Sequence, residues 1–345
     1  MNNGQLRLTL PEQKSGGSTM GLGLSRFQYT KGLHDLGNGG YAWLQPDGGW
    51  GWSNAGLIVD GGESFLIDTL FDVPLTRDML DAMRKAEPKA AAKINTLVNT
   101  HHNGDHCNGN ECCQGAEIIA HKLAVEGMRH EPPALLAGFL DMAPGLGDLG
   151  KYVKQCFGPF DFKGVTQTLP EVTFETELTR HVGSKEIRIM HVGPAHTPGD
   201  ALVYVPADKT VFTGDILFIE GHPIMWEGPV SNWIDACDRI MAMDVETVVP
   251  GHGPITGKNG VKAVRDYLVY VRDEARKRYD AGLSAFDAAL DIDMTDYDSW
   301  GDGERIVVNV TTLYKEFSGD DTPNDVPTIF GQMAEITKRQ GRLKG

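Results

Sequence analysis

Short apolar or alternating runs, each closed by a turn rich in glycine, proline, asparagine or aspartate, recur along the chain between residues 41 and 249. Such runs are typical of buried or half-buried strands. We predict strands at 41–44, 53–59, 64–68, 94–99, 116–121, 172–175, 186–192, 201–205, 211–212 and 247–249. Apolar positions at helical spacing predict helices at 74–87, 232–243, 261–281, 284–290 and 305–317. Two strand-rich halves, each followed by helices, indicate an α/β (α+β) fold with two sheets packed face to face and helices outside.

The segment 122–162 departs from this pattern. It is rich in large apolar residues, but several glycines and prolines interrupt it and its apolar positions follow no clear spacing. Long irregular insertions often cover binding sites, which favours a lid over an active site. A helical pair packed on the body of the protein or in an oligomer contact explains the same composition. Both interpretations stay open.

We divide the chain into three parts. Residues 1–37 are rich in glycine and polar residues and read as a loosely ordered N-terminal arm. Residues 38–275 form the main domain, and residues 276–345 form a helical C-terminal extension. The extension has more apolar residues than a solvated tail needs. We therefore expect it to pack on the body of the protein or across a homodimer interface.

Composition limits the partners and the compartment. The 345 residues are 41% hydrophobic and 23% charged, as in soluble globular proteins. A formal net charge of −15 repels phosphate backbones and anionic membrane surfaces, so neither nucleic acid nor membrane is an expected partner. The five cysteines suggest no disulfide framework, and no run is apolar enough for a signal peptide or a membrane span. We expect a cytoplasmic protein.

Histidines and aspartates gather in turns that follow predicted strands. Strand ends place side chains where loops from distant parts of the chain can build one site. Imidazole nitrogens and carboxylate oxygens are ligands that zinc accepts. The sequence therefore predicts a metal site. Its candidate ligands are His101, Asp105, His106, His196, Asp215 and His252.

In their order along the chain, these residues resemble the metal-ligand signature of the metallo-β-lactamase superfamily. The family signature is His-x-His-x-Asp-His, followed by a distal histidine, a bridging aspartate and a last histidine. The chain departs from it at one position, where Asn103 replaces the second histidine. The resemblance implies a four-layer αββα sandwich over roughly residues 38–275.

The resemblance also implies two adjacent metal sites that share Asp215. One would be held by Asp105, His106 and His252. The other would need His101, residue 103 and His196, and Asn103 offers only a neutral amide oxygen, a poor zinc ligand. We expect one zinc at the complete site, with a weaker second zinc as the alternative. His102 is no substitute, because neighbouring side chains in an extended segment point in opposite directions.

The activity that the resemblance implies is hydrolysis of a small molecule, such as an ester, lactone, thioester, amide or activated aryl halide. A metal-bound water ionises near pH 7 and would supply the attacking hydroxide. Asp105 would orient it and accept its proton, and the Asn103 amide would donate a hydrogen bond to developing negative charge. An iron-dependent oxidoreductase on the same fold is the alternative, because the sequence does not separate iron from zinc. A non-catalytic scaffold fits the nearly complete ligand set less well.

Four further residues lie near these motifs in the sequence. His222 and Trp226 follow Asp215, and a loop that leaves a metal site often lines the substrate pocket. We predict that His222 hydrogen-bonds the substrate and that Trp226 stacks on it, with ordinary packing as the alternative. Cys107 is interpreted as a small buried residue. Asp68 is expected to hold the metal loop by accepting hydrogen bonds.

Overall fold

The structure is a computed structural model that describes residues 21–344. Its first sheet has seven strands in the sequential order β1 to β7. Strands β1 to β4 pair antiparallel, and β4 to β7 pair parallel. Their bounds are β1 Gly32–Gly37, β2 Gly40–Leu44, β3 Ala55–Asp60, β4 Glu63–Ile67, β5 Thr96–Asn99, β6 Glu117–His121 and β7 Val172–Phe174.

The second sheet has five strands in the order β12-β11-β10-β9-β8. All its pairs are antiparallel except β11 with β12, which run parallel. Since β11 and β12 are parallel, the segments that carry Asp215 and His252 leave this sheet at the same edge. The bounds are β8 Glu177–Val182, β9 Lys185–His191, β10 Ala201–Val205, β11 Thr210–Phe212 and β12 Thr247–Val249.

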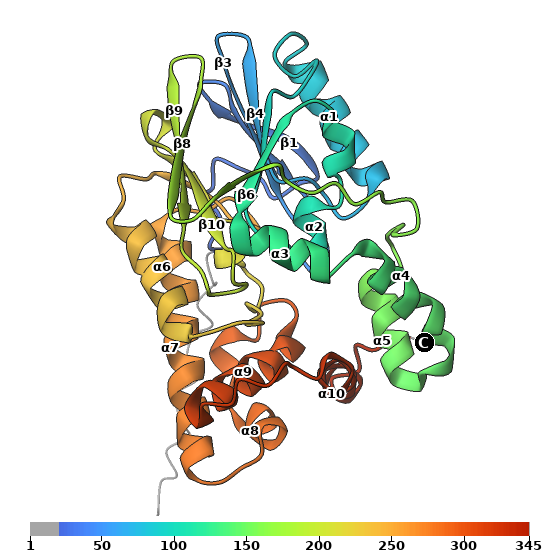
Figure 1. The fold of residues 1–345 in the computed structure, drawn as a ribbon. Coiled ribbons are helices and arrows are strands. Elements are labelled where there is room, and N and C mark those ends of the chain that lie inside the picture. Colours follow the sequence, from blue (N-terminus) through green and yellow to red (C-terminus); the bar gives the residue numbers. More distant parts are fainter. Residues whose placement is uncertain (1–20, 345) are drawn as a thin grey trace, which may run out of the picture.

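Helices cover the outer face of each sheet, and the two sheets pack against each other through their inner faces (Figure 1). Buried side chains such as Phe65, Ile189 and Phe212 fill the space between the sheets. On the outside, α1 Val73–Ala86 buries Met79 and Met83 against the first sheet. Helices α6 Val230–Ala242 and α7 Lys258–Asp280 cover the second sheet. This is the four-layer αββα arrangement that the sequence predicts.

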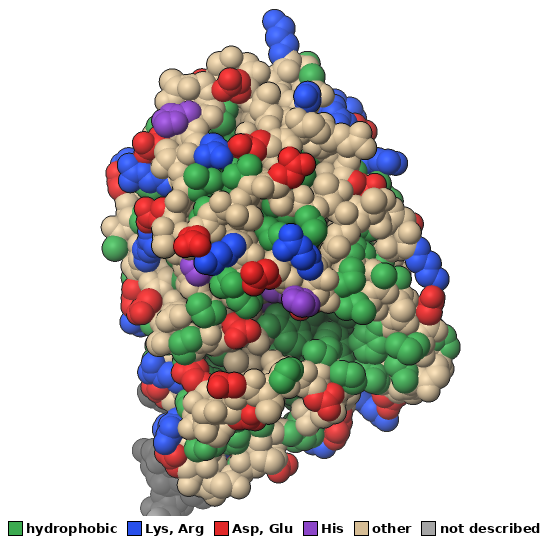
Figure 2. Space-filling model, in the orientation of Figure 1, with side chains coloured by type: hydrophobic (Ala, Val, Ile, Leu, Met, Phe, Trp, Pro, Cys, Tyr) green, Lys and Arg blue, Asp and Glu red, His purple; other side chains and the backbone are tan. Residues whose placement is uncertain are grey.

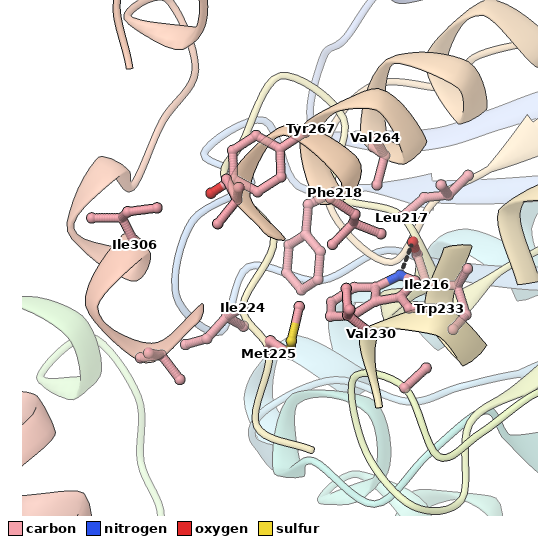
Figure 3. Packing of buried hydrophobic residues seen from close by; sticks show 14 of the residues in the cluster. Ile216, Leu217, Phe218, Ile224, Met225, Val230, Trp233, Val264, Tyr267 and Ile306 are labelled. Carbon is pink, nitrogen blue, oxygen red and sulfur yellow. Dashed lines mark hydrogen bonds between the residues drawn. The ribbon is translucent and has the colours of Figure 1, made fainter. Parts of the chain in front are cut away.

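The core on the α6 side is built around Trp233, which is fully buried (Figure 3). Its indole Nε1 donates a 2.9 Å hydrogen bond to the carbonyl oxygen of Ile216. Phe218 and Tyr267 lie in the same cluster. This packing fixes the segment that immediately follows β11 and carries Asp215.

Three α-helices lie in the segment 122–162, for which a lid and a packed helical pair were both expected. They are α3 Lys122–His130, α4 Pro133–Met142 and α5 Gly147–Phe157. The C-terminal extension adds α8 Ala285–Asp291, α9 Ile306–Ser318 and α10 Val326–Arg339. Helix α10 packs on α5, where Phe330 lies 5.9 Å from Phe157 between ring centroids. The extension thus packs on the body of the protein.

Some elements differ from the predicted ones. Strand β1 lies inside the stretch expected as an arm and pairs with β2, whereas residues 1–20 of that arm lie outside the described residues. The expected boundary at residue 275 falls within α7. Strand β8 is an edge strand with mostly exposed side chains, so its sequence carries little apolar signal. Within the described part of the chain, no helix is both long and apolar enough to cross a membrane.

Candidate metal centre

All six predicted ligands meet at one edge of the sandwich. His101 and His106 are completely buried, with their ring centroids 4.3 Å apart. The ring centroid of His196 lies 5.1 Å from that of His101. The ring centroid of His252 lies 5.6 Å from that of His106. These histidines come from loops after β5, β9 and β12, which are far apart in the sequence. The predicted convergence of strand-end side chains is therefore present.

Asp215 lies at the middle of this cluster. Its Oδ1 is 3.1 Å from Nε2 of His106, and its Oδ2 is 3.3 Å from Nε2 of His196 and 3.4 Å from Nε2 of His252. His101 Nε2 is 3.7 Å from Oδ2. One carboxylate thus faces four imidazoles, which is the geometry that a shared metal ligand requires.

Two overlapping groups have ligand atoms close enough to hold an ion. One consists of His101, His106 and Asp215, and the other of Asp105, His106 and His252. Within each group the ligand atoms all lie within 4.8 Å of one another. His106 belongs to both, so its Nε2 faces the centre of the cluster.

Several of these atoms are buried without a hydrogen-bond partner among residues 21–344. They are Nε2 of His101, Nε2 of His106 and Oδ1 of Asp215. Buried polar atoms in folded proteins are nearly always paired, because an unpaired one costs about 1–3 kcal/mol. Two imidazole nitrogens and a carboxylate oxygen aimed at one point are a donor set that a divalent cation such as zinc satisfies. The residues present therefore fit a metal ion.

Electrostatics within the cluster keep Asp215 ionised. Burial by itself raises the pKa of this carboxyl, but His252, His106 and His101 outweigh burial and hold it well below its ordinary value. Burial by itself lowers the pKa of the His252 imidazole. The carboxylates of Asp215 and Asp105 outweigh burial and raise this pKa to about 9. A bound metal cation would take the place of the proton on His252, because a metal binds only deprotonated imidazole nitrogens.

Asp68 holds the first metal loop, as predicted. Its carboxylate accepts hydrogen bonds from the backbone N–H of Thr100 at 2.7 Å and from the Thr100 hydroxyl at 2.8 Å. It also accepts one from Nδ1 of His106 at 2.9 Å. Since Nδ1 of His106 carries the proton, Nε2 keeps its lone pair for a metal. Asp68 itself has a left-handed backbone with φ of +62°, so the position is strained for a non-glycine residue.

Glycine at position 251 lets two loops approach closely. A Cβ atom there would lie 2.0 Å from Oδ1 of Asp215 and 2.7 Å from the carbonyl carbon of Gly214. Any side chain at Gly251 would therefore displace the shared carboxylate.

Ser53 and Asn54 join the metal loops to each other, and the sequence analysis did not single them out. Ser53 donates a 2.5 Å hydrogen bond to the carbonyl oxygen of Asp105. The Asn54 side-chain amide donates to the carbonyl oxygens of Pro250 and Gly253, on either side of His252. The only sequence signal was a pair of small polar residues before an apolar run, which is common in turns.

Asn103 contacts His196. Oδ1 of its amide group lies 2.7 Å from Nε2 of His196, while Nδ1 of His196 donates to the carbonyl oxygen of Ile224 at 2.6 Å. Burial lowers the pKa of His196 to about 4, so the ring is neutral at pH 7 and its Nε2 is an acceptor. The two ends of an amide have the same shape, so turning the group by 180° would present its NH₂ to this nitrogen. In either orientation Asn103 lies against the nitrogen that a metal would need at His196.

The remaining predicted residues lie around the cluster. His102 points away from it, with Nε2 3.5 Å from Glu131 beside α3. Cys107 is buried, and its thiol donates to the carbonyl oxygens of His102 and Asn103. Both placements agree with the predictions.

His222 and Trp226 occupy different surroundings. His222 is 2% exposed, and its Nδ1 is 3.1 Å from the hydroxyl of Tyr267. These contacts fit the packing alternative. Trp226 is half-buried and stacks on Phe330 of α10.

Protonation of His252 predicts a pH dependence for the metal-free protein. Its pKa of about 9 lies above the ~6.5 of an unfolded chain, so its charged form stabilises the fold fully below pH ~6.5. That contribution is lost as the pH rises through about 9, and we expect the free energy of unfolding to fall by about 3 kcal/mol. Urea unfolding of chelator-treated protein between pH 6 and 10 measures it. His252→Gln should flatten the curve, and an unchanged slope in this variant would contradict the assignment.

Known proteins resemble this chain over the part that carries the candidate ligands. The family model described as the metallo-beta-lactamase superfamily matches residues 48–252. Hydroxyacylglutathione hydrolase from Rhizobium meliloti is 26% identical over 181 residues, which cover 52% of this chain and 54% of the relative. A probable hydroxyacylglutathione hydrolase from Schizosaccharomyces pombe is 24% identical over 190 residues, covering 54% and 59%. The chain thus spans somewhat more than half the length of these curated relatives.

Two solved structures are similar over more of the chain. The sec-alkylsulfatase Pisa1 from Pseudomonas sp. has 18% sequence identity and a TM-score of 0.63, over 84% of this chain and 50% of its own. A metallo-beta-lactamase from Pontibacter korlensis has 17% identity and a TM-score of 0.52, over 69% of this chain and 98% of its own. At these identities the likeness shows a shared fold.

Proposed function

The chain belongs to the metallo-beta-lactamase superfamily, and on that premise we propose that it is a metal-dependent hydrolase of a small molecule. The observation that carries the proposal is the group of ligand atoms on Asp105, His106 and His252, which all lie within 4.8 Å of one another. Beside them, Nε2 of His106 and Oδ1 of Asp215 are buried without a hydrogen-bond partner among residues 21–344. Relatives that are hydrolases by name support the reaction class. Zinc is the metal that this mixture of imidazole and carboxylate ligands favours.

Asp105 is the ligand best placed to meet the water that reacts. Its side chain is 11% exposed, whereas those of His101 and His106 are completely buried. Burial opposes ionisation of Asp105, but His106 and His252 outweigh it and lower its pKa, so the group is a carboxylate at neutral pH. A divalent metal bound here lowers the pKa of a water molecule to about 7.

The proposed reaction balances without a further reagent. The water gives one proton to Asp105, and its oxygen forms a bond to the electrophilic atom of the substrate. The bond to the leaving group then breaks, and the leaving group takes the proton from Asp105. The ester, lactone, thioester, amide and aryl-halide classes all fit this scheme.

The test combines metal analysis with hydrolysis. Protein purified without added metal should contain about one zinc per chain. Chelator treatment should abolish hydrolysis across a panel of esters, lactones, thioesters and amides, and zinc should restore it. A chain that binds no metal, or that hydrolyses the panel equally well after chelation, would remove the basis of the proposal.

We further propose that one metal binds, at Asp105, His106, Asp215 and His252. The support is the contact between Asn103 and Nε2 of His196, which engages the nitrogen that a second metal would need. This changes the role expected for Asn103, because its amide, turned so that the NH₂ faces Nε2, would donate to His196. The amide then positions His196 and has one N–H left for the substrate.

Asn103→His tests the number of metals. The new imidazole replaces a poor ligand and releases Nε2 of His196, so the metal content should rise from about one to about two per chain. Elemental analysis of protein dialysed against buffered zinc measures the ratio. Asn103→Ala is the matched control, because it frees His196 but adds no ligand, and it should stay at about one. Two metals in the unchanged chain would contradict the single-metal proposal.

A further inference from the structure

Apolar side chains gather around a hollow beside the metal centre. In Figure 2 the hollow lies below α3 and between α4 and α10, as placed in Figure 1, and its walls are almost entirely hydrophobic. The hydrophobic cluster that packs between α4, α5 and α10 supplies six residues that we call the apolar wall. They are Trp50, Leu136, Phe139, Leu140, Trp226 and Phe330.

The aromatic members of the apolar wall contact one another across four separate segments. Trp226 stacks on Phe330 with ring centroids 6.3 Å apart and an interplanar angle of 12°. Trp50 lies 5.5 Å from Phe330 and 6.4 Å from Trp226. Phe139 of α4 lies 5.9 Å from Phe330. The wall therefore joins the loop at residue 50, the insertion, the segment after Asp215 and the C-terminal extension.

Helix α4 is unusual because it is apolar yet poorly covered. Its sequence is PALLAGFLDM, and Pro133 is its only buried residue. Leu135 and Met142 are 58% and 60% exposed. An apolar helix left this open next to a hollow leaves hydrophobic surface for another molecule.

The apolar wall borders the metal loops through buried contacts. Trp226 lies two residues after Ile224, whose carbonyl oxygen accepts a hydrogen bond from Nδ1 of His196. The buried guanidinium of Arg305 lies over both Trp50 and Phe218, and Phe218 stacks on the ring of His252. The wall and the metal ligands thus share the same supporting residues.

This proximity favours a substrate over a second copy of the chain as the occupant. A second copy would cover the outermost residues, Leu135 and Met142, but would gain nothing from the closeness of Trp226 to the segment that holds His196. A net charge of −15 also opposes self-association.

We propose that the substrate carries a large uncharged apolar group, an alkyl chain or an aryl ring system, which the apolar wall binds while the hydrolysable bond lies at the metal ligands. The inference rests on the proposed hydrolytic function for its substrate. Binding to the apolar wall is measured without hydrolysis, so the wall and the proposed hydrolytic function can be contradicted separately.

The experiment titrates 1-butanol, 1-hexanol and 1-octanol into the protein and follows binding by calorimetry. Each methylene group removed from water contributes ~0.8 kcal/mol, a gain of about fourfold in affinity, so each step of two carbons should tighten binding by about fifteenfold. Trp226→Ala and Phe139→Ala should each weaken the binding of 1-octanol by about tenfold or more. Leu290→Ala is the matched control, because Leu290 is a 39% exposed leucine on α8, outside the wall, and it should change nothing.

Three results would overturn the proposal. The first is binding that does not strengthen with chain length, and the second is an equal loss in Leu290→Ala. The third is a dimer by light scattering that dissociates in a Leu135→Ser, Met142→Ser variant, since the face would then belong to a second copy. A protein that binds no metal or hydrolyses nothing, but still binds the alkanols, would contradict the proposed function. The apolar wall would then remain a binding site.

Discussion

Replacing Asp215 by asparagine is expected to abolish metal binding and to lower the hydrolytic rate at least about a thousandfold, which corresponds to ~4 kcal/mol of activation free energy. Asparagine has the same shape, so the fold should persist. Its neutral amide cannot balance the charge of a metal cation, and its NH₂ would be forced towards imidazole nitrogens that need their lone pairs for the metal.

The contacts of the Asp215 carboxylate explain why its loss should have so large an effect on metal binding. Asp215 is the carboxylate that lies within 3.7 Å of His101, His106, His196 and His252 at once. It is 4% exposed, so water cannot compensate for the lost charge. Removing one partner from a buried charge network leaves the others uncompensated.

Zinc content and turnover should be measured together on Asp215→Asn. Asp244→Asn is a suitable control, because Asp244 has a 74% exposed side chain that faces only Lys209 at 3.4 Å. The control should keep both its metal and its activity. A variant Asp215→Asn that holds a full complement of zinc would show that the metal lies elsewhere.

The second large effect is expected for Asp68→Asn, which should weaken metal binding by about 10–100-fold. Asp68 accepts from three donors, namely the N–H and hydroxyl of Thr100 and Nδ1 of His106. An amide can accept at only one end. Its NH₂ would oppose a donor and tilt the imidazole of His106 or shift its proton to Nε2.

Competition with a metal indicator measures the affinity. Asp60→Asn is a matched control, because Asp60 also accepts from a backbone N–H and a hydroxyl, both of Ser184, but on an exposed hairpin. Its affinity for metal should not change. If Asp68→Asn bound zinc as tightly as the unchanged protein, the orientation of His106 would not depend on this carboxylate.

Much of the fold follows from local patterns. The helix predicted at 74–87 is present as α1, and the strand predicted at 201–205 is present as β10. Both have strong periodic signals and buried faces. By contrast, α4 is apolar around most of its surface, so it lacks the one-sided pattern that marks an amphipathic helix. Helix α10 does bury one face, with Ile329, Phe330 and Met333, and was not among the predicted helices.

The αββα sandwich and the six candidate ligands can be predicted from the amino-acid sequence, because strand ends and residue types are local properties. Only the tertiary structure placed Asn103 against Nε2 of His196, and only it placed His222 in a buried contact with Tyr267. It also assembled the apolar wall, from residues 50, 139, 226 and 330. These contacts join positions far apart in the chain, and their geometry depends on how whole layers pack, which no local pattern encodes.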